Sequence, residues 1–289
     1  MYFKNIFYKL FKNNIKYNVI FLHFITTDNI GDLYCCPKTY FKEFKKCKEF
    51  EIKNSFFFGN ESKTLIIGGG GLLQEYFEEP LKSIIQHKGN NKIIFWGAGL
   101  DNTPVGGTFN TLILEGADLI GIRDFNTQYN YVPCVSCMSK HFDKYRLKKP
   151  KTKIRCYINS AYDFPEFLIN SFETYTNNQD YKRKNALEKA IRFLSEAEYI
   201  ITNSFHGAYW ATLLNRKVIV LPFSKDGNIK FSDKFLTLKY KPVYIDSFEG
   251  IENFLEEKLK EAKNYPEAIQ DARMHNIEFY KKVKKQFLA

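Results

Sequence analysis

Residues 202–212 read TNSFHGAYWAT and stand between two short apolar runs, residues 199–201 and 217–221. Apolar runs of this length, bounded by turn-forming residues, predict strands. The stretch between them has room for a tight turn and a short helix. The order strand, turn, helix, strand is typical of an α/β protein with a parallel sheet.

The start of this predicted helix carries polar chemistry. Asn203 or Ser204 can cap it, and Gly207 would let a ligand approach the backbone. The free N–H groups of a helix start favour a phosphate or a carboxylate. His206 lies in the first turn and would face the bound group. The stretch therefore predicts a site for an anionic donor, with a buried, hydrogen-bonded histidine as the alternative.

The rest of the chain repeats this alternation. The apolar runs are rich in Ile, Val and Phe and are continuous, which is typical of strands buried on both faces of a parallel sheet. Candidate strands span residues 18–24, 63–67, 92–96, 117–122, 153–158, 198–201, 217–221 and 242–245. Helical patterns span residues 72–86, 185–196 and 251–263, and a final helix follows Pro266 towards Phe287.

A basic linker divides the chain. Residues 140–153 hold seven Lys or Arg residues, one Pro and few apolar side chains. We therefore expect a boundary near residue 150, with one Rossmann-like lobe at 1–150 and a second, with the terminal helices, at 151–289. Ligands of such sheets bind outside the carboxyl ends of the strands, here in the cleft between the lobes.

The first predicted strand is followed by a polar turn, residues 26–32 (TTDNIGD). Gly31 permits a sharp turn, and Asp32 can cap the next helix. The alternative is that Asp32 is part of the cleft.

The second strand is followed by four glycines, residues 68–71, which allow close contact with a ligand or with another strand. The third position of a dinucleotide fingerprint falls on Leu73, so that motif is absent. Anion binding at Gly69 and Gly70 and simple packing both remain open. Gly99, after the third strand, gives the same signal more weakly.

Arg123 and Asp124 follow the fourth predicted strand. An arginine at the carboxyl end of an apolar strand is well placed to bind a carboxylate or a phosphate through two parallel hydrogen bonds. A local ion pair between the two residues is the alternative.

Composition and charge limit the kinds of partner that this chain is expected to bind. The formal net charge is +11, which suits an anionic partner, but no nucleic-acid-binding motif accompanies it. No segment has 18 consecutive apolar residues, so no membrane-spanning helix is expected. Residues 1–16 form an amphipathic pattern, which predicts either contact with a membrane surface or a helix docked on the core.

The chain has six cysteines, two of them in a CxxC pattern at Cys134 and Cys137. Structural thiols, a metal site and a redox pair all remain open for this pattern. Free thiols favour a cytoplasmic location.

In order and placement, these motifs resemble those of the polysaccharide pyruvyl transferase family. The matching segments are residues 29–32 (NIGD), 67–71 (IGGGG), 96–99 (WGAG), 123–124 (RD), 204–207 (SFHG) and 218–222 (VIVLP). The resemblance implies two Rossmann-like lobes similar to those of GT-B glycosyltransferases. It also implies transfer of a pyruvyl group from phosphoenolpyruvate onto two sugar hydroxyls, as a ketal, with release of phosphate. The acceptor would be a sugar of a surface polysaccharide, or of its lipid-linked or nucleotide-linked precursor.

The resemblance also suggests roles for individual residues. His206 looks like the donor-binding histidine of the family and Arg123 like its first-lobe arginine. Lys225 and Lys230 are candidates for a basic residue that follows this histidine by roughly twenty positions. Phe205 stands where many members carry arginine. The second lobe is short compared with that of longer members, because residues 159–197 hold little room for additional strands.

Ketal formation needs an acid that protonates the methylene carbon of phosphoenolpyruvate. Protonated His206, with a pKa near 6.5, is one candidate, and the carboxyl candidates are Asp32, Asp124 and Asp163. We expect neither a metal nor another cofactor. Two other functions remain open: a nucleotide-sugar-dependent glycosyltransferase on the same scaffold, and a non-catalytic glycan- or anion-binding relative.

Overall fold

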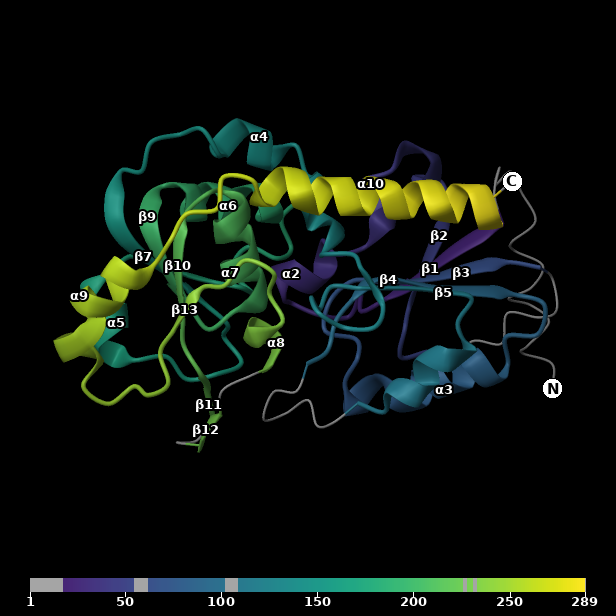
Figure 1. The fold of residues 1–289 in the computed structure, drawn as a ribbon, viewed down its shortest axis with the longest axis horizontal. Helices are drawn as coiled ribbons and strands as arrows, with labels where there is room; N and C mark the ends of the chain where they lie inside the picture. Colours follow the sequence, from purple (N-terminus) through teal and green to yellow (C-terminus); the bar gives the residue numbers. More distant parts are fainter. Residues whose placement is uncertain (1–17, 55–61, 102–108, 226–227, 231–232, 289) are drawn as a thin grey trace.

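The computed structural model describes residues 18–54, 62–101, 109–225, 228–230 and 233–288. It shows an α/β protein with two parallel β-sheets that lie side by side (Figure 1). We call the parts around the first and second sheet the N-terminal half and the C-terminal half. The amphipathic pattern predicted at residues 1–16 lies outside the described residues.

The first sheet has six strands in the order β2-β1-β3-β4-β5-β6, and each neighbouring pair is parallel. The strands span Val19–His23 (β1), Lys48–Glu51 (β2), Thr64–Gly68 (β3), Lys92–Ala98 (β4), Leu119–Ile122 (β5) and Asn130–Tyr131 (β6).

The second sheet has five parallel strands in the order β13-β10-β9-β7-β8. A separate antiparallel hairpin pairs β11 with β12. The strands span Thr152–Ile158 (β7), Thr174–Thr176 (β8), Ala197–Thr202 (β9), Lys217–Val220 (β10), Phe223–Lys225 (β11), Asn228–Lys230 (β12) and Val243–Tyr244 (β13).

The two sheets share one topology. When the strands of each are numbered in chain order, both read 2-1-3-4-5, and the first sheet adds a sixth strand at its edge. In each sheet the chain reverses its direction of growth between the first and third strands, β1 and β3 or β7 and β9. Such a switch point leaves a crevice at the carboxyl ends of the strands.

Helices cover both faces of the first sheet. Leu22, Leu65 and Ile67 point to the face covered by α3 and η4, whereas Phe21 and Ile66 point to the face covered by η1, η2 and α10. The helices of this half span Ile30–Leu33 (α2), Pro37–Thr39 (η1), Lys42–Phe44 (η2), Glu75–Phe77 (η3), Glu78–Gln86 (α3), Thr111–Gly116 (η4), Val135–Met138 (η5) and His141–Tyr145 (α4).

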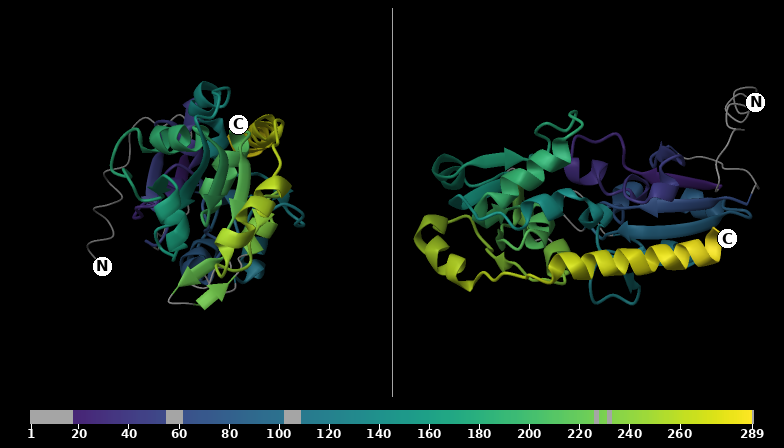
Figure 2. Two further views of the ribbon diagram at one scale, coloured as in Figure 1. Left: turned by 90° about the vertical axis from the view of Figure 1, so that its left-hand side faces the viewer. Right: turned by 90° about the horizontal axis from the view of Figure 1, so that it is seen from above.

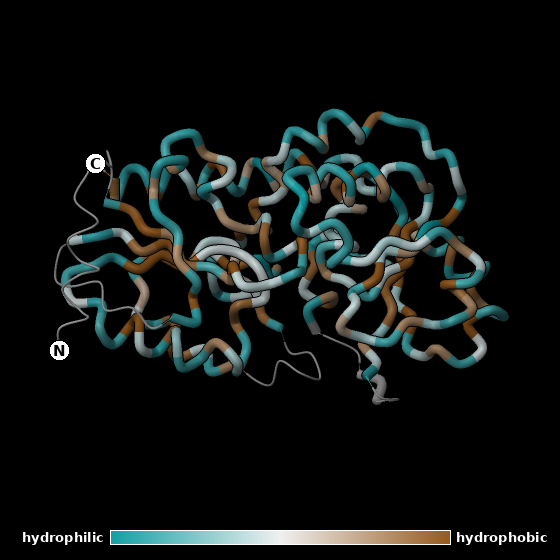
Figure 3. The backbone as a smooth tube through the Cα atoms, turned by 180° about the vertical axis from the view of Figure 1, so that it is seen from behind, coloured by the Kyte–Doolittle hydropathy of each residue, from teal (hydrophilic) through white to brown (hydrophobic). Residues whose placement is uncertain are grey.

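The second sheet is covered in the same way. Tyr157, Ile200 and Val218 pack with α4, α6 and α7, and Ile154 and Ile219 pack with α9 on the other face. Both cores follow the apolar strands, which run through the interior of each half (Figure 3). The helices span Glu166–Ser171 (α5), Ala186–Ser195 (α6), Phe205–Leu213 (α7), Asp233–Leu236 (α8), Ile251–Glu261 (α9) and Ala268–Phe287 (α10).

Helix α10 leaves the C-terminal half and runs along the N-terminal half (Figure 2). Asn276 accepts a hydrogen bond from Trp96 Nε1 at 2.9 Å and donates one to the Pro133 carbonyl at 3.0 Å. Tyr280 stacks on Phe41 with ring centroids 4.5 Å apart. The last helix therefore ties the two halves together, although its residues belong to the predicted second lobe.

The eight predicted strands are confirmed as β1, β3, β4, β5, β7, β9, β10 and β13. The predicted boundary near residue 150 falls between the last strand of the first sheet and the first strand of the second. Within the part of the chain that the structure describes, no helix is long and apolar enough to span a membrane.

Candidate active site

A pocket of about 260 Å³ lies between the two halves, at the carboxyl ends of β1 and β3 and of β7 and β9. Both switch points therefore face one cavity, as expected for doubly wound sheets. Six of the predicted site residues line it: Asp32, Gly69, Gly70, Arg123, Ser204 and His206.

His206 is held at the start of α7. Ser204 is the N-cap residue, and its hydroxyl accepts a hydrogen bond from the Gly207 N–H at 3.3 Å. The His206 ring is almost fully buried, and its Nε2 lies 3.5 Å from Cys134 Sγ. Burial lowers the pKa of His206 well below its usual range, and the charges of Arg123 and Lys234 lower it further.

The expectation that His206 titrates near 6.5 is therefore wrong, because the imidazole has too little contact with water to carry a charge between two cations. In the free protein it is neutral. A neutral imidazole can accept a proton from a substrate hydroxyl.

Gly31 has a role other than the predicted sharp turn. It lies within α2 rather than at a positive φ, and a Cβ at this position would collide with the His206 imidazole. The glycine thus leaves space for a side chain of the other half. The capping role predicted for Asp32 is also wrong, because Asn29 caps α2 by accepting a hydrogen bond from the Gly31 N–H at 3.0 Å.

Asp32 instead points towards the pocket from the first turn of α2. A Cβ on Gly70 would lie 2.9 Å from Asp32 Oδ1. The glycines that follow β3 therefore pack against this carboxyl group. Burial raises the pKa of Asp32 to about 6; Asp101 contributes to the rise, while Arg123 and Lys234 oppose it. A carboxyl group with this pKa is partly protonated near neutral pH, as a general acid requires.

Arg123 reaches the pocket from the end of β5, and 4% of its surface is exposed. Its guanidinium carbon lies 3.7 Å from the centroid of the Phe205 ring, so Phe205 supports this side chain by a cation–π contact. Arg123 Nε has no hydrogen-bond partner among the described residues. A Cβ on Gly99 would collide with the guanidinium, which explains the glycine there. The side chain is therefore held in place, with its Nε, unpaired among the described residues, beside Gly99.

Lys234 is a pocket residue that the sequence analysis missed. It lies on α8, is buried, and its Nζ is 3.2 Å from Asp101 Oδ1. Burial lowers its pKa, while Asp101 partly restores it. Asp101 follows β4, in the loop that also contains Gly99. A carboxylate at this position was the one feature of the sequence that could have indicated a nearby cation.

The other candidates have different positions. Both carboxylate oxygens of Asp124 are engaged, by the Leu100 N–H at 2.8 Å and by the Thr237 hydroxyl at 2.7 Å. Asp124 thus joins the two halves, and it is absent from the described residues that line the pocket. Lys225 is exposed on the β11–β12 hairpin, and Lys230 belongs to the partner strand of that hairpin.

The strand ends of the C-terminal half supply neutral polar groups. Asn177 Oδ1 accepts hydrogen bonds from the Ser160 N–H and hydroxyl, both at 3.0 Å. The Asn177 amide donates to Asn159 Oδ1 at 3.1 Å. Its backbone carbonyl accepts from the Ile30 N–H at 2.8 Å, which joins this loop to α2. These amides and hydroxyls form an uncharged surface that is ordered by its own hydrogen bonds.

All six cysteines are free and buried. In the CxxC, Cys134 contacts the Ser136 hydroxyl at 3.2 Å as well as His206. Burial raises the pKa of both Cys134 and Cys137, so these thiols remain protonated at neutral pH. This environment favours the structural interpretation of the motif.

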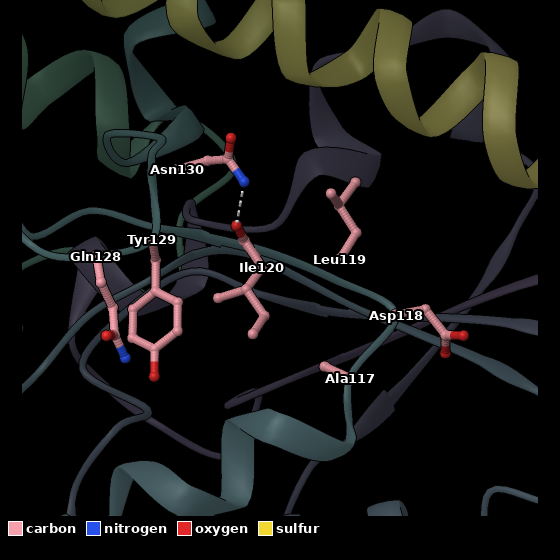
Figure 4. A pocket seen from close by; sticks show the side chains of 7 residues that line it. All are labelled: Ala117, Asp118, Leu119, Ile120, Gln128, Tyr129 and Asn130. Carbon is pink, nitrogen blue, oxygen red and sulfur yellow. Dashed lines mark hydrogen bonds between the residues drawn. The ribbon is translucent and has the colours of Figure 1, made fainter.

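A second, shallower cavity of about 370 Å³ lies at the edge of the first sheet, between β5 and β6 (Figure 4). Asn130 closes one side by donating a hydrogen bond to the Ile120 carbonyl at 2.9 Å. Asp118 is the charged residue among those that line it, and it already binds Lys88 and Lys92. Among the described residues that line this cavity, Asp118 is the only one with a charge. The pocket between the two halves is therefore the better candidate for an active site.

Fold and site together define an α/β protein whose two parallel sheets face one pocket that contains the cations Arg123 and Lys234. A family model described as polysaccharide pyruvyl transferase matches residues 3–224. The match spans well over half of the chain, and the chain therefore belongs to the polysaccharide pyruvyl transferase family. The resemblance inferred from the motifs is confirmed.

Among solved structures, the chain is similar to a functionally uncharacterised protein from Klebsiella pneumoniae. The two share 18% sequence identity with a TM-score of 0.50, over 86% of this chain and all of that one. At this identity the likeness concerns the fold alone. The comparison with curated proteins gave no match.

Proposed function

We propose that this chain transfers a pyruvyl group from phosphoenolpyruvate to two hydroxyls of a polysaccharide sugar, in a cleft similar to that of GT-B enzymes. The observation that carries the proposal is the set of groups in one pocket: two cations, a carboxyl group with a raised pKa and a neutral imidazole. Two titratable groups whose surroundings push their pKa values in opposite directions are a common arrangement of a catalytic acid and base.

The donor would bind between Arg123 and Lys234. Phosphoenolpyruvate carries a carboxylate and a phosphate, roughly three negative charges if its phosphate ionises like that of a phosphorylated side chain. The planar Arg123 fork suits either group, and the N–H groups at the start of α7 favour the phosphate. Asp101 would compete for Lys234, so donor binding would loosen that ion pair.

The chemistry follows from the two protonation states. Asp32 gives its proton to the methylene carbon, which becomes a methyl group, and positive charge develops on the adjacent carbon. A sugar hydroxyl attacks that carbon and loses its proton to neutral His206. A second hydroxyl then displaces phosphate and closes the cyclic ketal, and its proton leaves with the phosphate as HPO4²⁻. The proton held by His206 returns to Asp32 through solvent, which restores both groups. The products are the pyruvyl ketal and inorganic phosphate, and we propose that no cofactor takes part.

The acceptor would bind against the neutral surface at Asn159, Ser160 and Asn177. The nucleotide-sugar alternative needs a carboxylate for the donor ribose on the second sheet. Among the described residues from the C-terminal half that line the pocket, none is a carboxylate. This composition favours phosphoenolpyruvate over a nucleotide sugar.

Calorimetry tests the donor. We expect the full-length protein to bind phosphoenolpyruvate, and to bind it more tightly than inorganic phosphate, because only the intact donor engages both cations. Binding of nucleotide sugars without binding of phosphoenolpyruvate would contradict the proposal. Mass spectrometry of the surface glycan from a strain without this chain tests the reaction, since the pyruvyl increment should disappear from the repeat unit.

A further inference from the structure

Three side chains with metal-binding atoms meet beside the pocket. His23 is the last residue of β1, Glu49 lies on the neighbouring strand β2, and Cys36 directly precedes η1. Their ligand atoms all lie within 4.8 Å of one another. The adjacent residues Phe24 and Cys35 line the pocket, so the cluster lies directly behind the pocket wall.

The imidazole of this cluster is buried and has an ion-pair partner, Glu49, but no hydrogen bond of ordinary length among the described residues. Only 4% of the His23 surface is exposed, and neither ring nitrogen has a hydrogen-bond partner among the described residues. Its Nε2 is 3.6 Å from Glu49 Oε2, too far for a hydrogen bond. Burial opposes a charge on this ring, yet its interactions with Cys36 and Glu49 raise the pKa of His23 to about 9. Without a metal ion the imidazole is therefore a cation paired with Glu49, and an ion that binds here takes the place of its proton.

The carboxylate is arranged to complete a site. Lys38 Nζ lies 3.1 Å from Glu49 Oε1, which leaves Oε2 facing His23. About 41% of the Glu49 side chain is exposed, so a small ion can enter past it. Cys36 and His23 are too deeply buried to reach a substrate carbonyl, which argues against a cysteine nucleophile with a histidine base.

We propose that His23, Cys36 and Glu49 bind one divalent transition-metal ion of the zinc type, with water as the fourth ligand. Nitrogen, sulfur and oxygen donors are the ligands that zinc takes in proteins, and three protein ligands with one water form an open tetrahedral site. Binding displaces two protons to solvent, the thiol proton of Cys36 and the imidazolium proton of His23, and closes the three donors around the ion. The ion then ties β1, β2 and η1 together beside the turn that carries Asp32.

Cobalt provides the direct test on the full-length, reduced protein after treatment with a chelator. We expect one Co²⁺ per chain, with a thiolate-to-cobalt charge-transfer absorption that Zn²⁺ abolishes by displacement. Cys36→Ser should remove that absorption. Glu49→Gln, a change at a half-exposed side chain that leaves the core intact, should weaken Zn²⁺ binding roughly tenfold or more.

Matched variants locate the ion. Cys47→Ser alters another buried thiol of the same core, outside the cluster, and should keep both the absorption and the stoichiometry. Cys134→Ser should also keep them. Loss of the absorption in Cys134→Ser but not in Cys36→Ser would overturn the proposal, as would a native protein that binds no Co²⁺. None of these readouts requires phosphoenolpyruvate, so they are independent of the proposed reaction.

Discussion

The two sides of the pocket are built by the same strand order and carry different chemistry. Strand ends of the first sheet supply Asp32, Asp101 and Arg123, all of which can carry charge. Strand ends of the second sheet supply amides, hydroxyls and a neutral histidine, while the cation Lys234 comes from α8, outside the sheet. A shared topology therefore supplies only the position of the site, and the loop residues supply its chemistry.

This difference suggests a division of labour. We call the side with Asp32, Asp101 and Arg123 the charged wall and the side with the amides and hydroxyls the neutral wall. In the proposed reaction, the charged wall would bind the donor anion and supply its proton, and the neutral wall would bind the sugar hydroxyls. The two walls meet through close contacts, because Gly31 of the N-terminal half adjoins His206 and Asn177 of the C-terminal half binds the backbone of α2. Variants on each wall can separate the two roles.

The largest expected effect is on turnover, from the proposed acid. Asp32→Asn keeps the size of the side chain and removes its transferable proton, so kcat should fall by roughly 10²–10⁴-fold. The donor affinity measured by calorimetry should change little or rise, because one negative charge is lost near the anion. Phosphate release with acceptor glycan is the measurement.

Asp163→Asn is the matched control for this experiment. Asp163 is an exposed carboxylate that accepts a hydrogen bond from the Ser224 hydroxyl at 2.9 Å, on the other half of the molecule. If Asp163→Asn lost turnover while Asp32→Asn retained it, the charged wall would not supply the proton.

A smaller effect is expected on donor binding. Arg123→Ala removes a buried guanidinium with a free Nε, and phosphoenolpyruvate affinity should fall by roughly 10- to 100-fold, the value of one or two charge-assisted hydrogen bonds. Calorimetry measures the loss. Arg183→Ala, at an exposed arginine paired with Asp180, is the control and should bind normally. Unchanged affinity in Arg123→Ala would place the donor elsewhere.

The sequence predicted the interior of this fold better than its edges. Continuous apolar runs identified every strand that is buried on both faces. Of the four edge strands that the structure describes in the two parallel sheets, β13 was predicted, whereas β2, β6 and β8 were not, because sequences such as KEFE, NY and TYT are short and polar and resemble loops. Their pairing depends on the neighbouring strand, which is a tertiary effect that local patterns do not contain.

The site shows the same limit. Residues placed directly at strand ends, such as Arg123 and Ser204, were predicted because parallel strands bring their carboxyl ends together. Lys234 lies on a four-residue helix, and its partner Asp101 is 133 positions away in the chain, so no local pattern joined them. The predicted pKa of His206 was wrong for a related reason, because the side chain is buried mainly by other parts of the chain.

The smallest effects concern stability, and here two carboxyl groups should respond in opposite ways. Asp32 has a folded-state pKa raised from 3.8 to about 6, so it costs stability as the pH rises through that window, and the full cost applies above it. Glu196, bound by Arg155 at 2.8 Å, has a pKa lowered from 4.5 to about 2 although burial opposes the shift. It contributes stability above pH 4.5, and that contribution is lost as the pH falls towards 2.

Chemical denaturation at pH 7.5 should therefore show Asp32→Asn to be more stable than the native protein and Glu196→Gln to be less stable, by about 1–3 kcal/mol in each case. At a pH near 4 the gain from Asp32→Asn should largely vanish, because the native carboxyl group is then protonated in the folded state and causes little cost. A gain in stability joined to a loss of turnover is what a residue retained for catalysis produces. If Asp32→Asn were destabilising at pH 7.5, the carboxylate would be a structural partner of Arg123 and Lys234, and the acid of this pocket would have to be sought in another group.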